Sequence, residues 1–147
     1  MTADNSVRFL ARPGHEAALR GDAAIEALAG RVPNASLHSG DLVLPSPVNA
    51  HDHGYGIRLL DFGSMDDALE VWIPTMRLRP RTDAYLEALV AFGRLAQTGV
   101  GTTMHCHNSL NVARLIEEAL DVIRAAGDIG IRFGLSCPLL DHDPWAY

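Results

Sequence analysis

The apolar positions of the chain follow two spacings in turn, one typical of helices and one typical of strands. Apolar residues repeat every three or four positions over four segments, which predicts helices at 16–29, 68–73, 82–99 and 109–127. Candidate caps precede three of these segments, at Ser64, Thr82 and Ser109. Candidate stops follow at Gly30, Pro74, Gly99 and Gly127. The helices are therefore expected to be short and separately bounded.

Short apolar runs lie between the predicted helices. The first runs over 42–50 and is interrupted by Pro45 and Pro47, which cannot donate to a continuous ladder. Two more strands are expected at 99–107, which is rich in β-branched residues, and at 129–136. The last residues, 137–147, show no periodicity. Strands that alternate with helices predict an α/β fold of parallel βα units, whose sites lie beyond the carboxyl ends of the strands.

The length of 147 residues, 48% of them hydrophobic, suits one globular domain with its own core. Within it we expect a mostly helical N-terminal segment over 1–40 and the βα units over 41–147. Acidic and basic residues are mixed and the net charge is -6, which argues against a nucleic-acid partner. No apolar window is long enough to cross a membrane and no signal peptide is recognisable, so a cytoplasmic location with reduced Cys106 and Cys137 is expected.

Four of the seven histidines form two His-x-His pairs, each at the end of a predicted strand. These are "HDH" at 51–53 and "HCH" at 105–107. In a regular strand, residues i and i+2 point to one face, so each pair can aim both rings at one point. Neutral imidazole binds zinc, iron and manganese, and such an ion acidifies water for hydrolysis at neutral pH. A chance pair with a structural or solvent-exposed role is the alternative.

The sequence around the first pair resembles a known family. "LVLPSPVNAHDHG" at 42–54 is similar to the first-strand signature of the amidohydrolase superfamily. "RLLDFGSMDDALEVWI" at 58–73 and "LAQTGVGTTMHCHNS" at 95–109 resemble the first helix and second strand of its cytosine deaminase and triazine hydrolase branch. The resemblance extends from Asp41 to Asn108 and more weakly to Leu135.

This resemblance implies a metal-dependent hydrolase that cleaves a C–N or related carbon–heteroatom bond of a small nitrogenous compound. His51 and His53 take the places of the two first-strand ligands of one divalent ion, zinc or iron first. His107, with His105 and Asn108, takes the place of the second-strand substrate contacts. The fold it implies is the first three βα units of a (β/α)8 barrel.

The chain departs from the family in three respects. Ser46 and Pro47 replace a glycine and a bulky apolar residue at the entry to the first strand, and the segment 1–40 does not resemble the small β-sandwich of the family. A barrel needs about 200 to 250 residues. The later ligands and the aspartate that accepts the proton are not encoded here, and His142 and Asp143 match neither. We therefore expect a companion chain or segment to complete the barrel, and an oligomeric protein.

Other interpretations of the same residues remain open. The four paired histidines could form a closed zinc site, or one of His105 and His107 could pack in the barrel wall. The whole chain could be a non-catalytic interaction module with vestigial histidines. Asp52 is expected to point away from its neighbours as a structural acceptor, and Cys106 is expected to be buried without a base on its face. Tyr55 and Arg58 follow the first pair and face either substrate or solvent.

Overall fold

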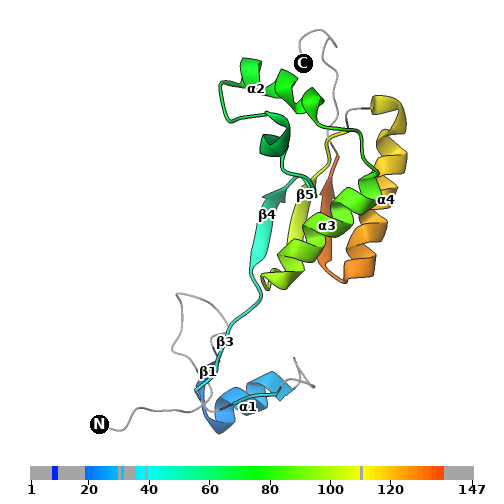
Figure 1. Ribbon diagram of the computed structural model, residues 1–147. Helices are drawn as coiled ribbons and strands as arrows, with labels where there is room; N and C mark the ends of the chain where they lie inside the picture. The colour runs from blue at the N-terminus through cyan, green and yellow to red at the C-terminus, as the bar shows by residue number, and fades with distance from the viewer. Residues whose placement is uncertain are drawn as a thin grey trace. The chain divides into compact units, whose positions relative to one another are not determined.

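The computed structural model describes residues 8–9, 19–29, 31, 36–38, 40–109 and 111–137. The chain divides between Ser46 and Pro47 into two compact units, residues 1–46 and 47–147 (Figure 1). The interrupted strand expected over 42–50 is shared between them, because its two halves belong to different sheets. The division therefore falls at the pair of prolines rather than near residue 40.

The first unit is a small mixed sheet beside one helix. Its elements are β1 (Arg8–Phe9), β2 (Leu19–Arg20), α1 (Asp22–Ala29) and β3 (Leu42–Val43). β1 lies between the other two strands, antiparallel to β2 and parallel to β3. On α1, Ala24 and Leu28 are buried against Leu37 and Val43.

The prediction that residues 1–40 are mostly helical is wrong for the part of that segment that the structure describes. The helix expected from Glu16 begins only at Asp22, after the extended pair Leu19–Arg20. Gly21 separates the two with a φ of 56°, a left-handed conformation that favours glycine and does not continue a helix. Alanine-rich composition predicted helix on both sides of a residue that breaks it.

The second unit confirms the mixed α/β prediction. Its sheet is parallel, in the order β4 (Val48–Asp52), β5 (Thr102–Cys106) and β6 (Arg132–Ser136). Helix α3 (Ala84–Gln97) connects the first two strands, and α4 (Leu115–Ile129) connects the last two. No described helix is long and apolar enough to span a membrane.

Helices α3 and α4 pack on each other and cover one face of this sheet (Figure 1). Their contact is rich in small residues, which let the two backbones approach closely, and Phe92 fills the space between them and the sheet. The ring of Phe92 lies 5.6 Å from that of Phe133 on β6 and 5.8 Å from that of His105 on β5. The core of the unit therefore reaches the strand that carries the second histidine pair.

The opposite face of the sheet is open. Strand alternation and register place Val48, Met104 and Gly134 there, with Val48 65% and Met104 42% exposed. The Met104 side chain lies over Gly134, where a Cβ would come within 2.9 Å of its terminal methyl. One face of the sheet is thus packed and the other presents apolar side chains to solvent.

The link from β4 to α3 differs from its prediction. It contains η1 (Leu59–Phe62), α2 (Leu69–Thr75) and η2 (Met76–Leu78). Ser64 does not cap α2, since its hydroxyl lies 2.8 Å from that of Thr75, and Ala68 precedes the helix without a side-chain cap. Pro74 lies inside α2 rather than after it, and the chain then tightens into η2.

The two long helices have other boundaries than expected. Asp83, not Thr82, caps α3, because its Oδ1 accepts from the Leu86 amide at 3.0 Å. Ser109 forms a local turn with Asn111 instead of a cap, and η3 (Val112–Arg114) precedes α4. Gly127 lies within α4, which continues to Ile129 and so shortens the strand expected from residue 129.

Candidate metal and ligand-binding site

The carboxyl ends of β4 and β5 carry the two histidine pairs side by side. His51 lies in β4 and His53 directly after it, while His105 lies in β5 and His107 directly after that strand. The register is shifted between Asn49 and Asp52, and Asp52 pairs with His105. The pairs therefore face differently: His105 lies on the helix-covered side, whereas His51 lies beside Cys106 on the open side.

The first pair brings two imidazole nitrogens together. Nε2 of His51 and Nε2 of His53 lie 3.2 Å apart, with the rings at 83° to each other. Nδ1 of His53 lies 2.9 Å from the carbonyl oxygen of Cys106. Because a carbonyl only accepts, that nitrogen carries the proton, and a neutral His53 then has a lone pair on Nε2. A backbone carbonyl in this role also holds the ring in place, as outer partners do in metal sites.

The pair fits two corners of a metal site. Zinc–nitrogen bonds of about 2.0–2.1 Å at a tetrahedral angle put two nitrogens about 3.3–3.4 Å apart, close to the separation seen here. The described residues provide no third ligand, since no group of three or more His, Cys, Asp or Glu side chains among them could hold an ion. The closed site built from all four paired histidines is therefore not formed.

Asp52 and Cys106 lie between the paired histidines in sequence but have different surroundings. The Asp52 carboxylate accepts from the Asn49 amide at 2.9 Å and from the Gly54 backbone at 2.6 Å, so it is a structural acceptor. Sγ of Cys106 lies 3.4 Å from Nδ1 of His51. The expectation that no base shares a face with this thiol is wrong, because the shifted register turns His51 toward it.

The second pair is buried. His105 and His107 are 2% and 5% exposed, and Nε2 of His105 lies 3.3 Å from Nδ1 of His107. Burial, with a smaller effect from His107, lowers the pKa of His105 to about 4. Burial also lowers the pKa of His107, against the opposing charge of Glu118. Both rings are therefore neutral at pH 7, and His105 packs between Phe92 and Phe133 as a wall residue would.

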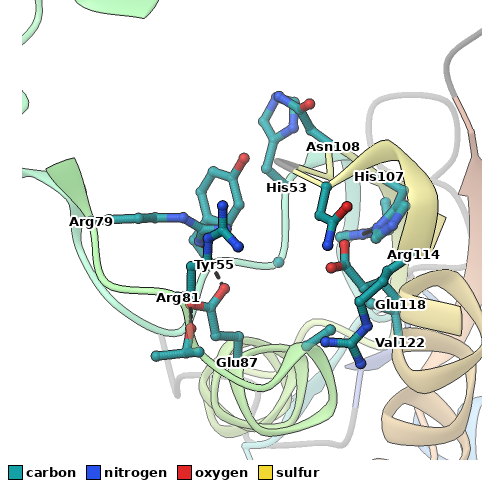
Figure 2. Close-up of a pocket in the computed structure, with 15 residues that line it drawn as sticks. His53, Tyr55, Arg79, Arg81, Glu87, His107, Asn108, Arg114, Glu118 and Val122 are labelled. Atoms are coloured by element: carbon teal, nitrogen blue, oxygen red, sulfur yellow. Dashed lines mark hydrogen bonds and ion pairs between the residues drawn. The ribbon is translucent and has the colours of Figure 1, made fainter. Parts of the chain in front are cut away.

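A cavity of about 110 Å³ opens beside the two pairs (Figure 2). His53, His105, His107 and Asn108 line it, so the structure brings together four of the five predicted site residues. His51 is not among the lining residues, because its side chain lies on the open side of the sheet. The cavity thus joins His53, the half-buried member of the first pair, to the buried second pair.

The loop His53–Gly56 is held tightly against its neighbours. Gly54 has a φ of 63°, and a Cβ there would lie 2.7 Å from Cε1 of His105. A Cβ at Gly56 would lie 2.7 Å from the carbonyl oxygen of Glu87, and Arg94 donates to the Gly56 carbonyl at 2.8 Å. The two glycines let the loop lie on β5 and α3, which places His53 and Tyr55 at the cavity.

An ion pair that sequence reasoning missed forms one wall of the cavity. Nη1 of Arg79 lies 2.8 Å from Oε2 of Glu87, with side chains 13% and 9% exposed, and the Thr82 hydroxyl donates to the same carboxylate. The Arg79 guanidinium lies 4.3 Å above the Tyr55 ring. Burial raises the pKa of Glu87, although Arg79 opposes the shift, and burial also raises the pKa of Tyr55.

One sequence signal could have indicated Glu87. It falls on the stripe of α3 that includes Ala84, Ala88 and Ala91, so an acidic residue stands where an apolar one is expected. Its partner Arg79 lies in an irregular segment at no recognisable spacing. Of the two loop residues left open, Tyr55 lines the cavity, whereas Arg58 pairs with Asp61 at the surface.

Comparison with known proteins adds no relative. No protein-family model matches the chain, and neither the curated proteins nor the solved structures give a significant match.

Proposed function

We propose that this chain is the N-terminal part of a metal-dependent hydrolase that cleaves a C–N or related bond of a small nitrogenous compound. The observation that carries the proposal is the His51–His53 pair, with its two Nε2 atoms 3.2 Å apart and His53 held by the Cys106 carbonyl. A divalent ion, zinc or iron first, would supply acidified water and polarise the bond to be cleaved.

The proposed fold is the beginning of a (β/α)8 barrel. Three parallel strands in sequence order, with helices on one face and apolar side chains on the other, support this proposal. In such a barrel the open face would be the interior, and β4 and β6 would pair with further strands. A companion chain or segment would supply those strands, the remaining ligands and the proton acceptor.

The cavity is the proposed substrate site. His107, His105 and Asn108 would contact the substrate, with Tyr55 also lining the cavity. Because both imidazoles are neutral, they bring no positive charge to the cavity, and the side-chain amide of Asn108 offers both a donor and an acceptor. A small molecule with both N–H and carbonyl or ring-nitrogen groups matches that arrangement.

Metal binding tests the proposal directly. The full chain is equilibrated with zinc and dialysed, and bound metal is measured for the native protein and for the double variant His51→Ala/His53→Ala. We expect zinc to bind and the double variant to lose it, because the variant removes both nitrogens of the pair. His38→Ala is the matched control, since His38 is exposed and lies in the first unit. Equal zinc in the native protein and the double variant would refute the assignment.

A non-catalytic interaction module is the second candidate. The observation that favours it is an exposed apolar stripe along η3 and α4, on the side away from the buried residues of α4: Val112, Ile116, Leu120 and Ile123. The same samples separate the two candidates if their mass is measured by light scattering. A metal-free oligomer of the native chain supports the module, whereas stoichiometric zinc supports the hydrolase.

A further inference from the structure

The cavity beside the histidine pairs has two facing walls, and each wall carries both positive and negative side chains. Figure 2 shows Arg79, Arg81 and Glu87 on one side and Arg114 and Glu118 on the other. His53 and Asn108 lie between these walls, and His107 lies on the side of Arg114 and Glu118. Whether a wall can recognise a charged ligand depends on which of its charges are already paired.

On the first wall, the carboxylate is used within the protein. Glu87 is buried and accepts from both Arg79 and Thr82, so its charge is balanced without a ligand. Arg79 is fixed between Glu87 and the Tyr55 ring. The Arg81 side chain makes no hydrogen bond or ion pair with the described part of the chain, although it lines the same wall. This wall therefore offers a guanidinium with all its donors available.

On the second wall, the cation is used instead. Arg114 forms two hydrogen bonds to Glu117, at 2.7 and 3.0 Å. The Glu118 side chain is only partly exposed, and it makes no hydrogen bond or ion pair with any residue that the structure describes. It therefore offers a carboxylate that can accept from a ligand.

We infer that the cavity binds a small dipolar molecule, with a carboxylate at one end held by Arg81 and an amine or other N–H donor at the other held by Glu118. His105 and His107 also line the cavity, so a ligand bound there lies beside their rings. Guanidinium pairs well with a planar carboxylate, and the partly buried position of Glu118 strengthens its interaction with an N–H donor. The identification of this dipolar molecule as a substrate rests on the proposed function, which takes the cavity as the substrate site.

A binding titration of the full chain tests the inference without added metal. The probe is γ-aminobutyrate, which has both charges, and its single-charge counterparts are butyrate and n-butylamine. The readout is the chemical shift of the His105 and His107 ring protons. We expect saturable shifts with γ-aminobutyrate and weaker binding of each counterpart, since each can use only one wall.

Two variants assign the ends of the ligand. Arg81→Gln should weaken binding of γ-aminobutyrate and butyrate by about threefold to fivefold, the range expected for a partly solvated ion pair. Glu118→Gln should weaken γ-aminobutyrate and n-butylamine by a similar factor and leave butyrate unchanged. Arg77→Gln and Glu70→Gln, which change exposed side chains outside the cavity, are the matched controls.

The results separate this inference from the proposed function. Absence of saturable shifts in the native chain, or equal binding by both cavity variants and their controls, would overturn the dipolar ligand. Zinc bound through His51 and His53 would still stand in that case, because the metal measurement uses neither wall. If the native chain bound γ-aminobutyrate but no zinc, the dipolar ligand would stand and the metal site of the proposed function would be refuted.

Discussion

At the scale of single residues, Gly54 decides how the two histidine pairs meet. Its backbone lies against the His105 ring, in a space that a side chain would fill, and it does so with a positive φ. Gly63 also has a positive φ, of 82°, but nothing lies within 4 Å of where its Cβ would be. A side chain at either position would strain the backbone, but only a side chain at Gly54 would also clash with a neighbour.

Alanine substitution at the two glycines should have unequal costs. Gly63→Ala should lower the free energy of unfolding by about 1 kcal/mol, the cost of left-handed backbone. Gly54→Ala should cost more, about 2–4 kcal/mol, because the methyl group also displaces His105. Urea unfolding of both variants measures the difference, and equal costs would show that the ring moves aside freely.

The buried second pair predicts how stability changes with pH. The folded protein holds the pKa of His105 at about 4, below the ordinary histidine value of 6.5, so the unfolded chain binds more protons between these values. Stability should be complete above about pH 6.5 and should fall as the pH drops toward 4, by about 2 kcal/mol at pH 5 and by about 3 kcal/mol in total for this group. Urea unfolding at pH 7 and pH 5 measures the loss.

His105→Gln should reduce that loss, because glutamine does not titrate. His38→Gln should leave it unchanged, since His38 is exposed. An identical pH dependence in the native protein and His105→Gln would mean that other groups cause the acid sensitivity. The lowered pKa of His107 makes the remaining dependence in His105→Gln nonzero.

At the scale of elements, the sequence pattern predicted which helices and strands form better than it predicted the residues at which they begin. The strands at 48–52, 102–106 and 132–136 and the helices at 84–97 and 115–129 all overlap predicted segments. Caps were misplaced because several side chains could accept from the same amides. Thr82 and Asp83 are adjacent and either side chain could cap the helix. In the structure the Thr82 hydroxyl contacts Glu87, and Asp83 accepts from the Leu86 amide.

The cap of α3 can be tested by substitution. Asp83→Ala should lower the free energy of unfolding by about 1 kcal/mol, since it removes the acceptor for the Leu86 amide. Asp66→Ala is the control, because Asp66 is exposed and precedes α2 without capping it. A loss of similar size in both variants would indicate a general charge effect rather than a cap.

At the scale of the whole molecule, local pattern accounts for the second unit better than for the first. Alternating strands and helices are a repeated local signal, and they predicted the parallel sheet and the meeting of the two histidine pairs. The first unit depends on pairing of two-residue strands, which leave no periodicity to detect. The Arg79–Glu87 wall could not be predicted either, because burial of an ion pair depends on tertiary packing.

The hydrogen bond from His53 to the Cys106 carbonyl joins positions 53 residues apart in the chain. One imidazole thus presents Nε2, the nitrogen proposed to bind metal, on one side and ties two neighbouring strands together on the other. By thermodynamic linkage, a ligand that binds this nitrogen would stabilise the pairing of β4 with β5. Separation of the two strands would in turn weaken binding of that ligand. Occupancy and folding of this corner of the protein are in that sense a single equilibrium.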